Sequence, residues 1–179
     1  ALYHDMKNHL LILERQNSDE TKQMAADLRR QISGYEEYIH TGNELLDVII
    51  HDKAKKAKEQ QIDFSAVIHF EASGFIEPMD LSTIFGNALD NAIEASVKLP
   101  PEQRLITVKA GRIQDVLMIV FENYAVMGKM NGTSKEDELL HGFGIPNIRK
   151  AVEKYHGECV IRQENGKFVM KNIIPLPEI

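Results

Sequence analysis

The chain has 179 residues, of which 43% are apolar, and a formal net charge of −6 at pH 7. This length suits one hydrophobic core with an additional smaller element. The acidic balance argues against a nucleic-acid-binding surface, and the single cysteine excludes a disulfide framework. Because the chain begins within a helical pattern and has no membrane-length apolar run, we expect a cytoplasmic fragment whose membrane attachment lies only in upstream segments.

Two helices are predicted over the first 39 residues, because apolar residues recur there every three or four positions. These residues form two narrow seams: Leu2, Met6, Leu10 and Leu13, then Ala25, Leu28, Ile32, Tyr35 and Ile39. Ser18 or Asp19 is suited to cap the second helix. A hairpin of two such helices cannot bury both seams alone, so we predict a four-helix bundle formed by a homodimer.

The first predicted helix carries the sequence His4-Asp5-Met6-Lys7-Asn8. Asn8 lies one turn beyond His4 on the same face, and Asp5 lies about 100° around the helix. Either side chain would hydrogen-bond one ring nitrogen of His4 and leave the other as a nucleophile. A lone histidine on a helix is more often a surface or packing residue, so this motif alone leaves both interpretations open. We interpret His9, on the seam side, as structural.

The helical pattern is interrupted at Thr41-Gly42-Asn43, and we place the domain boundary after Gly42, between units 1–42 and 43–179. The second unit begins with another helix, which ends in a charged run over residues 53–59. We interpret that run as a solvated helix end.

Five strands are predicted in the second unit from runs of apolar and β-branched residues. They cover Ile62–Glu71, Leu105–Ala110, Val116–Phe121, Val160–Arg162 and Phe168–Ile174. Asn165-Gly166 is typical of a type I′ turn between the last two strands. The predicted fold class is therefore α+β, a sandwich of helices on one face of a mixed, mostly antiparallel sheet.

The central helix of this unit has an unusual polar face. We expect Asp80 to cap it after Pro78, and its apolar residues, from Leu81 to Ile93, share one face. Asn87 and Asn91 lie one turn apart on the opposite face. Mg²⁺ prefers oxygen ligands and takes one or two protein groups plus substrate phosphates, which makes both asparagines candidate ligands. A polar face that only hydrogen-bonds a neighbouring element fits this stretch equally well.

Two glycines, Gly142 and Gly144, precede another helical pattern. Glycines let a backbone approach phosphate oxygens closely, and a following helix offers free N–H groups and the positive end of its dipole. The polar stretch before them, from Tyr124 to His141, is long for a loop and is typical of a binding lid. Its Lys135 is either a point charge for a nucleotide phosphate or a solvated loop residue.

In combination, Asn87-x-x-x-Asn91 and His141-Gly142-Phe143-Gly144 resemble the N box and second glycine box of the Bergerat-type (GHKL) ATPases. This superfamily includes gyrase, MutL and the sensor histidine kinases. The upstream motif around His4 resembles the phosphoacceptor motif of the kinases, and the order of motifs is most similar to the quorum-sensing branch that detects peptides. The resemblance implies binding of ATP with Mg²⁺, autophosphorylation of His4, and transfer to an aspartate on a response-regulator receiver domain.

One departure from the superfamily concerns the Asp-x-Gly-x-Gly motif, whose aspartate accepts a hydrogen bond from the adenine amino group. Here that place holds Glu122-Asn123-Tyr124, so Asn123 is the candidate for adenine recognition. Two alternatives are a phosphotransferase of the same fold that does not use ATP, and a noncatalytic Bergerat-fold binding module. The intact asparagine and glycine pairs favour the enzyme over both.

Overall fold

The computed structural model describes residues 2–15, 18–36, 39–71, 73–126 and 144–178. Contacts divide the chain into two compact units, Ala1–Ile39 and His40–Ile179. The boundary after Gly42, expected from the sequence, stays a prediction about which segments fold independently. Within the part of the chain that is described, no helix is long and apolar enough to cross a membrane.

The first unit consists of helices α1 (Leu2–Glu14) and α2 (Asp19–Glu36). Ser18 Oγ accepts a hydrogen bond from Thr21 N at 3.2 Å, so of the two predicted candidates, Ser18 and Asp19, it is Ser18 that caps α2. The Arg29 guanidinium forms an ion pair with Glu14, which links the two helices.

Among the predicted seam residues whose side chains are described, burial is partial. Ala25 is buried, and Leu10 and Leu28 are half-buried. His9 is exposed in the single chain, and its interpretation as a structural residue on the seam side stays a prediction. The dimeric four-helix bundle stays a prediction.

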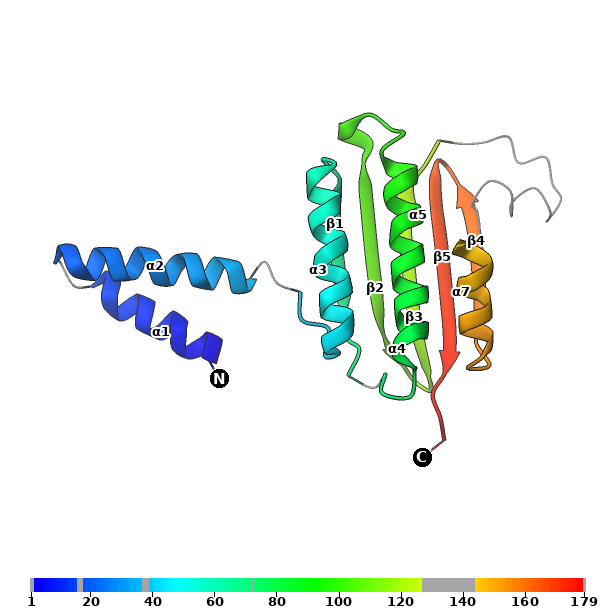
Figure 1. The fold of residues 1–179 in the computed structure, drawn as a ribbon, viewed down its shortest axis with the longest axis horizontal. Helices are drawn as coiled ribbons and strands as arrows, with labels where there is room; N and C mark the ends of the chain where they lie inside the picture. The colour runs from blue at the N-terminus through cyan, green and yellow to red at the C-terminus, as the bar shows by residue number, and fades with distance from the viewer. Residues whose placement is uncertain (1, 16–17, 37–38, 72, 127–143, 179) are drawn as a thin grey trace. The chain divides into compact units, whose positions relative to one another are not determined.

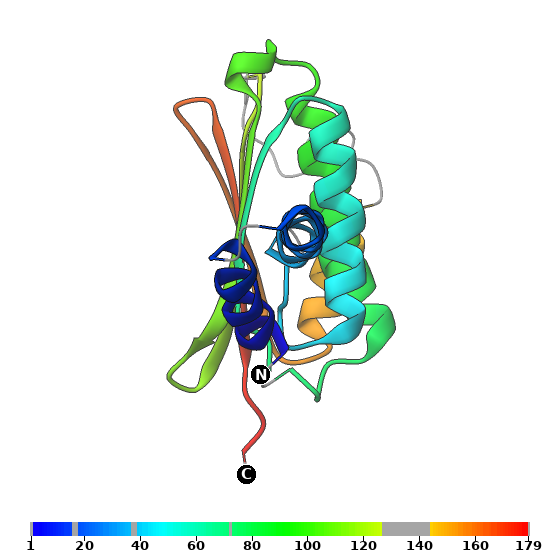
Figure 2. The ribbon, with the colours of Figure 1, turned by 90° about the vertical axis from the view of Figure 1, so that its left-hand side faces the viewer.

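The second unit is a two-layer sandwich whose five-stranded sheet has the order β1-β2-β3-β5-β4. Its strands are β1 (Asp63–Ile68), β2 (Leu105–Ile113), β3 (Val116–Tyr124), β4 (Glu158–Glu164) and β5 (Lys167–Pro175). Strands β1 and β2 pair in parallel, and the other pairs are antiparallel. Helices α3 (Glu44–Glu59), α5 (Asn87–Ser96) and α7 (Gly144–Glu153) cover one face of the sheet (Figures 1 and 2). The predicted mixed, mostly antiparallel sheet is confirmed.

Local sequence explains which face of the sheet is buried and where the last hairpin turns. Along β3 alternate residues are buried, which directs one face toward the helices. Asn165 and Gly166 have φ angles of 53° and 75°, as a type I′ turn requires, so the predicted turn is confirmed. In the core, the ring of Phe85 lies 5.4 Å from those of Phe70 and Phe121, in edge-to-face arrangements.

The central helix is a column of three helical segments that follow one another without a break. It comprises α4 (Pro78–Leu81), the π-helical turn η1 (Ser82–Gly86) and α5. The predicted apolar face is confirmed, because Ile84, Phe85 and Leu89 are fully buried. The cap assigned to Asp80 is wrong: Glu77 is the N-cap, and Pro78 is the first helical residue. Asp80 instead accepts hydrogen bonds from Lys154 and Tyr155, which directly follow α7.

The start of the second unit is anchored by local hydrogen bonds. Asn43 Oδ1 caps α3 by accepting from Leu46 N at 3.0 Å. Thr41 is buried and donates from its backbone N and its Oγ1 to Asp47 Oδ1, at 2.7 and 2.6 Å.

The charged run at the end of α3 is not simply solvated, which corrects the interpretation from sequence. Lys53 is buried, and its Nζ lies 2.6 Å from Asp90 Oδ1 on α5. Ala57, one turn further along α3, is fully buried. This stretch of α3 therefore packs against the rest of the unit.

Candidate functional site

The structure brings Gly144, Asn87 and Asn91 together. A Cβ atom added to Gly144 would lie 3.2 Å from Asn91 Nδ2, 3.3 Å from Asn91 Oδ1 and 3.6 Å from Asn87 Cβ. Two asparagines one turn apart on α5 therefore face the first residue of α7. A glycine suits this close approach, because a side chain at position 144 would crowd the Asn91 carboxamide unless that group shifted by a few tenths of an ångström.

The Asn91 carboxamide is incompletely paired. Its Nδ2 is buried and has no hydrogen-bond partner among the residues that the structure describes. An unpaired buried amide costs about 1–3 kcal/mol, so such a group calls for an acceptor. A phosphate oxygen is an acceptor of the required kind.

The start of α7 adds donors to the same place. The first N–H groups of a helix have no partner within the helix, and the helix dipole places partial positive charge there. Amide oxygens of Asn87 and Asn91 are ligands that Mg²⁺ accepts, and the glycine leaves room for a phosphate. The residues present therefore fit a phosphate group accompanied by Mg²⁺.

The carboxylate nearest these asparagines in sequence is directed to another neighbour. Asp90 is half-exposed and pairs with Lys53 on α3. Among the described His, Cys, Asp and Glu side chains, no group of three is placed to hold a metal ion. Among the described residues, this site therefore offers a cation neutral amide oxygens.

Asn123, the candidate for adenine recognition, lies at the end of β3 and is 4% exposed. It shares the helix-facing side of the strand with Phe121, which packs on Phe85. Its Nδ2 donates to Tyr124 O at 3.0 Å. This bond orients the carboxamide, so that its oxygen remains the acceptor expected of an adenine contact.

The other predicted site residues are not brought to this place by the described structure. Lys135 and Gly142 lie outside the described residues. His4, Asp5 and Asn8 belong to α1 in the first unit, where Asn8 is exposed and the side chains of His4 and Asp5 lie outside the described part. Their roles stay predictions.

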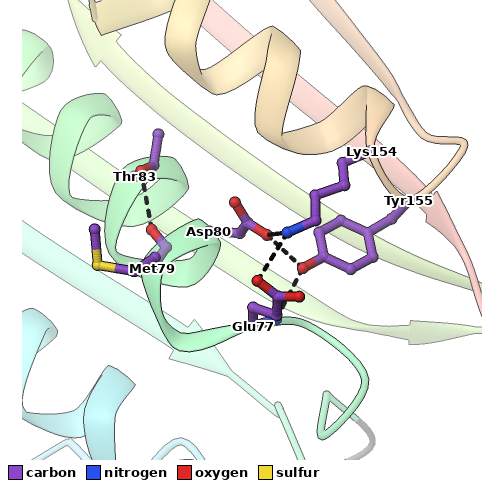
Figure 3. A network of polar contacts seen from close by, with 6 residues as sticks. All are labelled: Glu77, Met79, Asp80, Thr83, Lys154 and Tyr155. Atoms are coloured by element: carbon purple, nitrogen blue, oxygen red, sulfur yellow. Dashed lines mark hydrogen bonds and ion pairs between the residues drawn. The ribbon is translucent and has the colours of Figure 1, made fainter.

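A network of polar contacts that sequence reasoning missed joins the end of α7 to the start of α4 (Figure 3). Lys154 Nζ lies 2.8 Å from both Glu77 Oε2 and Asp80 Oδ2. Tyr155 OH donates to Asp80 Oδ2 at 2.5 Å and accepts from Glu77 N at 2.8 Å. The only signal in the sequence is an acidic first helical turn after Pro78, which does not indicate its partners.

These contacts shift the acid–base properties of their members. Burial raises the pKa of the Asp80 carboxyl, but the hydrogen bonds from Lys154 and Tyr155 outweigh burial and leave this pKa below its ordinary value. Hydrogen bonds to Asp80 and Glu77 raise the pKa of Lys154. Burial and the bond to Asp80 raise the pKa of Tyr155. The Asp80 carboxylate and the Lys154 ammonium therefore stay charged over the whole neutral range of pH.

The fold and the paired asparagines facing a helix start define a GHKL-type sandwich. Residues 76–175 match the family model described as GHKL domain, and this match covers more than half of the chain. The protein belongs to the GHKL domain family. A comparison with curated proteins finds no match.

Solved structures with this fold include three histidine kinases. The catalytic domain of histidine kinase ThkA is 18% identical with a TM-score of 0.56, covering 78% of this chain and 97% of that one. The Acinetobacter baumannii histidine kinase AdeS is 10% identical with a TM-score of 0.51, covering 98% of each chain. The kinase domain of blue-light-activated EL346 from Erythrobacter litoralis is 11% identical with a TM-score of 0.53, covering 97% of this chain and 94% of that one. At these identities the likeness shows the fold.

Proposed function

We propose that this chain is the cytoplasmic core of a sensor histidine kinase that transfers the γ-phosphoryl group of ATP to His4. The phosphoryl group then passes to an aspartate on a response-regulator receiver domain. The observation that carries the proposal is the contact of Gly144 with Asn91, whose buried Nδ2 has no partner among the described residues. GHKL domains bind ATP, and the phosphoacceptor-like sequence around His4 adds a histidine for the kinase reaction.

The nucleotide contacts follow from the chemistry of each side chain. Asn91 and Asn87 hold Mg²⁺ through their amide oxygens, and Asn123 accepts from the adenine amino group. The phosphates are held by the N–H groups at the start of α7, assisted by the predicted contacts of Gly142, Gly144 and Lys135. Bound Mg²⁺ supplies neutralisation of phosphate charge. The protein contributes position and orientation, on which phosphoryl transfer mainly depends.

His4 is the proposed nucleophile. Asp5 or Asn8 accepts the N–H of one ring nitrogen and thereby fixes the tautomer in which the other nitrogen carries a lone pair. That nitrogen forms the new bond to the γ-phosphorus as the bond to ADP breaks. A homodimer through α1 and α2 and membership of the quorum-sensing branch complete the proposal, and both rest on the sequence alone.

The test is incubation of the chain with labelled ATP and Mg²⁺, followed by separate acid and base treatment of the labelled protein. Phosphohistidine is acid-labile and base-stable, so the expected label survives base and is lost in acid. His4→Gln should bind nucleotide normally and take up no label, whereas His9→Gln, which changes an exposed neighbour, should still be labelled. Equal labelling of wild type and both variants would place the phosphoacceptor elsewhere.

The same experiment, repeated with a labelled phosphorylated receiver domain in place of ATP, separates the two alternative functions. A phosphotransferase that does not use ATP would take up label only from a phosphorylated receiver domain. A noncatalytic binding module would bind nucleotide by calorimetry and remain unlabelled under both conditions.

A further inference from the structure

Helix α7 is held at both ends against the same helical column, formed by α4, η1 and α5. At its start, Gly144 contacts Asn91. Beyond its last turn, Lys154 and Tyr155 bond to Glu77 and Asp80 (Figure 3). The helix between these contacts has ten residues and is therefore about 15 Å long.

We propose that Tyr155, assisted by Lys154, is a positioning residue that sets the axial position of α7. Through the rigid helix it thereby sets the approach of Gly144 to Asn91. The consequence for nucleotide binding rests on the proposed function, whereas the mechanical coupling between the two ends of α7 does not.

Tyr155 is the stronger of the two contacts. Its hydroxyl accepts from the backbone N of Glu77, the N-cap of α4, and donates to Asp80, so two bonds of opposite sense fix the oxygen. Its ring lies 6.0 Å from that of Phe75, edge to face, which fixes the ring as well. The side chains of Lys154 and Glu77 are 46% and 65% exposed, so water and salt screen their ion pair.

The start of α7 is sensitive to small displacements. A Cβ on Gly144 would lie 3.2 Å from Asn91 Nδ2, which is closer than ordinary van der Waals contact. A shift of α7 by a few tenths of an ångström would relieve that crowding, and equally would loosen any phosphate contact made there. Loss of the Tyr155 bonds at the far end of α7 should therefore reduce the destabilisation that a methyl group at position 144 causes.

The first test is a double-mutant cycle on the protein without nucleotide, using Gly144→Ala and Tyr155→Phe. Each variant is unfolded in urea, and the unfolding equilibrium constants are compared. Sites this far apart normally act additively. Gly144→Ala is expected to raise the unfolding equilibrium constant in the wild-type background. If Tyr155 holds α7, the factor by which it does so should be smaller in the Tyr155→Phe background by roughly threefold or more, which exceeds the usual additivity error. Additive effects would overturn the proposal.

A matched control replaces Tyr155→Phe by Tyr124→Phe in the same cycle. Tyr124 lies on β3, where its side chain points to the face opposite Asn123, away from α7. This control also removes one tyrosine hydroxyl, but from Tyr124, and should give additive effects. Coupling of equal size in this cycle would also overturn the proposal. Should Tyr155→Phe not fold, Lys154→Met runs the cycle with the phenol bonds in place, and the expected coupling is smaller but of the same sign.

The second test measures the affinity for Mg²⁺ and an unreactive ATP analogue by calorimetry, well below the unfolding temperature. Tyr155→Phe should bind roughly threefold to tenfold more weakly, the range typical of residues that act on a site through packing. Unchanged affinity beside a coupled cycle would overturn the link to the nucleotide site. A wild-type protein that binds no nucleotide would overturn the proposed function. The double-mutant cycle would then test only the mechanical coupling between Tyr155 and Gly144.

Discussion

Gly144 and Gly42 disfavour a side chain for two different reasons. Gly144 lies against the carboxamide of Asn91, so the constraint is the space that a partner side chain occupies. Gly42 has a φ of 89°, in the region that L-residues avoid, and a Cβ there would lie 2.5 Å from Glu71 Cγ. The first glycine concerns the candidate site, and the second concerns the stability of the second unit.

Gly42→Ala is therefore expected to lower the free energy of unfolding by about 1–3 kcal/mol, because the backbone must keep a strained φ. Gly74→Ala is the matched control, since nothing lies within 4 Å of a Cβ added there. Its effect should stay within about 0.5 kcal/mol. Urea denaturation of both variants measures the difference, and equal effects would contradict the role given to the backbone of Gly42.

Asn91→Ala should weaken Mg²⁺-dependent nucleotide binding by roughly a hundredfold or more, because loss of outer partners alone costs tenfold to a hundredfold at metal sites. Asn87→Ala, whose Cβ lies 3.6 Å from the added Cβ at Gly144, should weaken it less. Both variants should keep the circular dichroism spectrum of the wild type. Calorimetry with Mg²⁺ and the ATP analogue measures the affinities, and an unchanged value for Asn91→Ala would remove the proposed metal site.

At the scale of elements, α5 is fixed by neighbours on both of its flanks. On one side Asp90 pairs with Lys53 of α3, and on the other Asn91 meets the start of α7. Consecutive residues lie about 100° apart around a helix, so these two contacts restrain the rotation of α5 about its axis. The direction in which the asparagines point depends on both.

Lys53→Met should destabilise the protein by about 1.5 kcal/mol, the lower end of the usual contribution of a hydrogen bond to a charged group, because Asp90 is half-exposed. Methionine preserves the buried aliphatic stem, and Asp90 remains half-exposed, so no buried charge is left behind. Lys56→Met is the control, because Lys56 pairs with Asp52 on the exposed side of the same helix. Its effect on the urea midpoint should be less than half as large; a larger effect than that of Lys53→Met would refute the importance of the α3–α5 pair.

At the scale of the whole molecule, the predicted homodimer would cover apolar side chains that the first unit leaves exposed. In the first unit, Leu11, Ile12 and Met24 are 56–57% exposed, and Leu28 is only half-buried. Two helices alone thus leave apolar side chains in water, as expected of half of a bundle. The second unit has its own buried core and its own anchored start at Thr41.

Replacing Leu28 and Ile32 with Asp should therefore break the dimer, because each unpaired carboxylate buried in the seam costs several kcal/mol. The second unit should remain a folded monomer that still binds nucleotide. Light scattering measures the mass of both proteins. A wild-type chain that remains monomeric at tens of micromolar would refute the bundle.

The sequence by itself determined the features that depend on near neighbours along the chain. The apolar face of the central helix, the Ser18 cap and the Asn165-Gly166 turn follow from spacing within a few residues, and all three are confirmed. The same local reasoning singled out Asn91 and Gly144 as candidates, because their residue types are unusual for a helix face and a helix start.

Only the tertiary structure decided which distant groups meet. Lys53 and Asp90 are 37 positions apart, and Asp80 and Tyr155 are 75 apart, so no local sequence pattern predicts either pair. The local propensity of aspartate for helix caps even favoured the wrong role for Asp80. Packing of α3 and α7 on either side of α5 creates these contacts, and it places Gly144 on Asn91, because side chains far apart in sequence become neighbours only when the layers close.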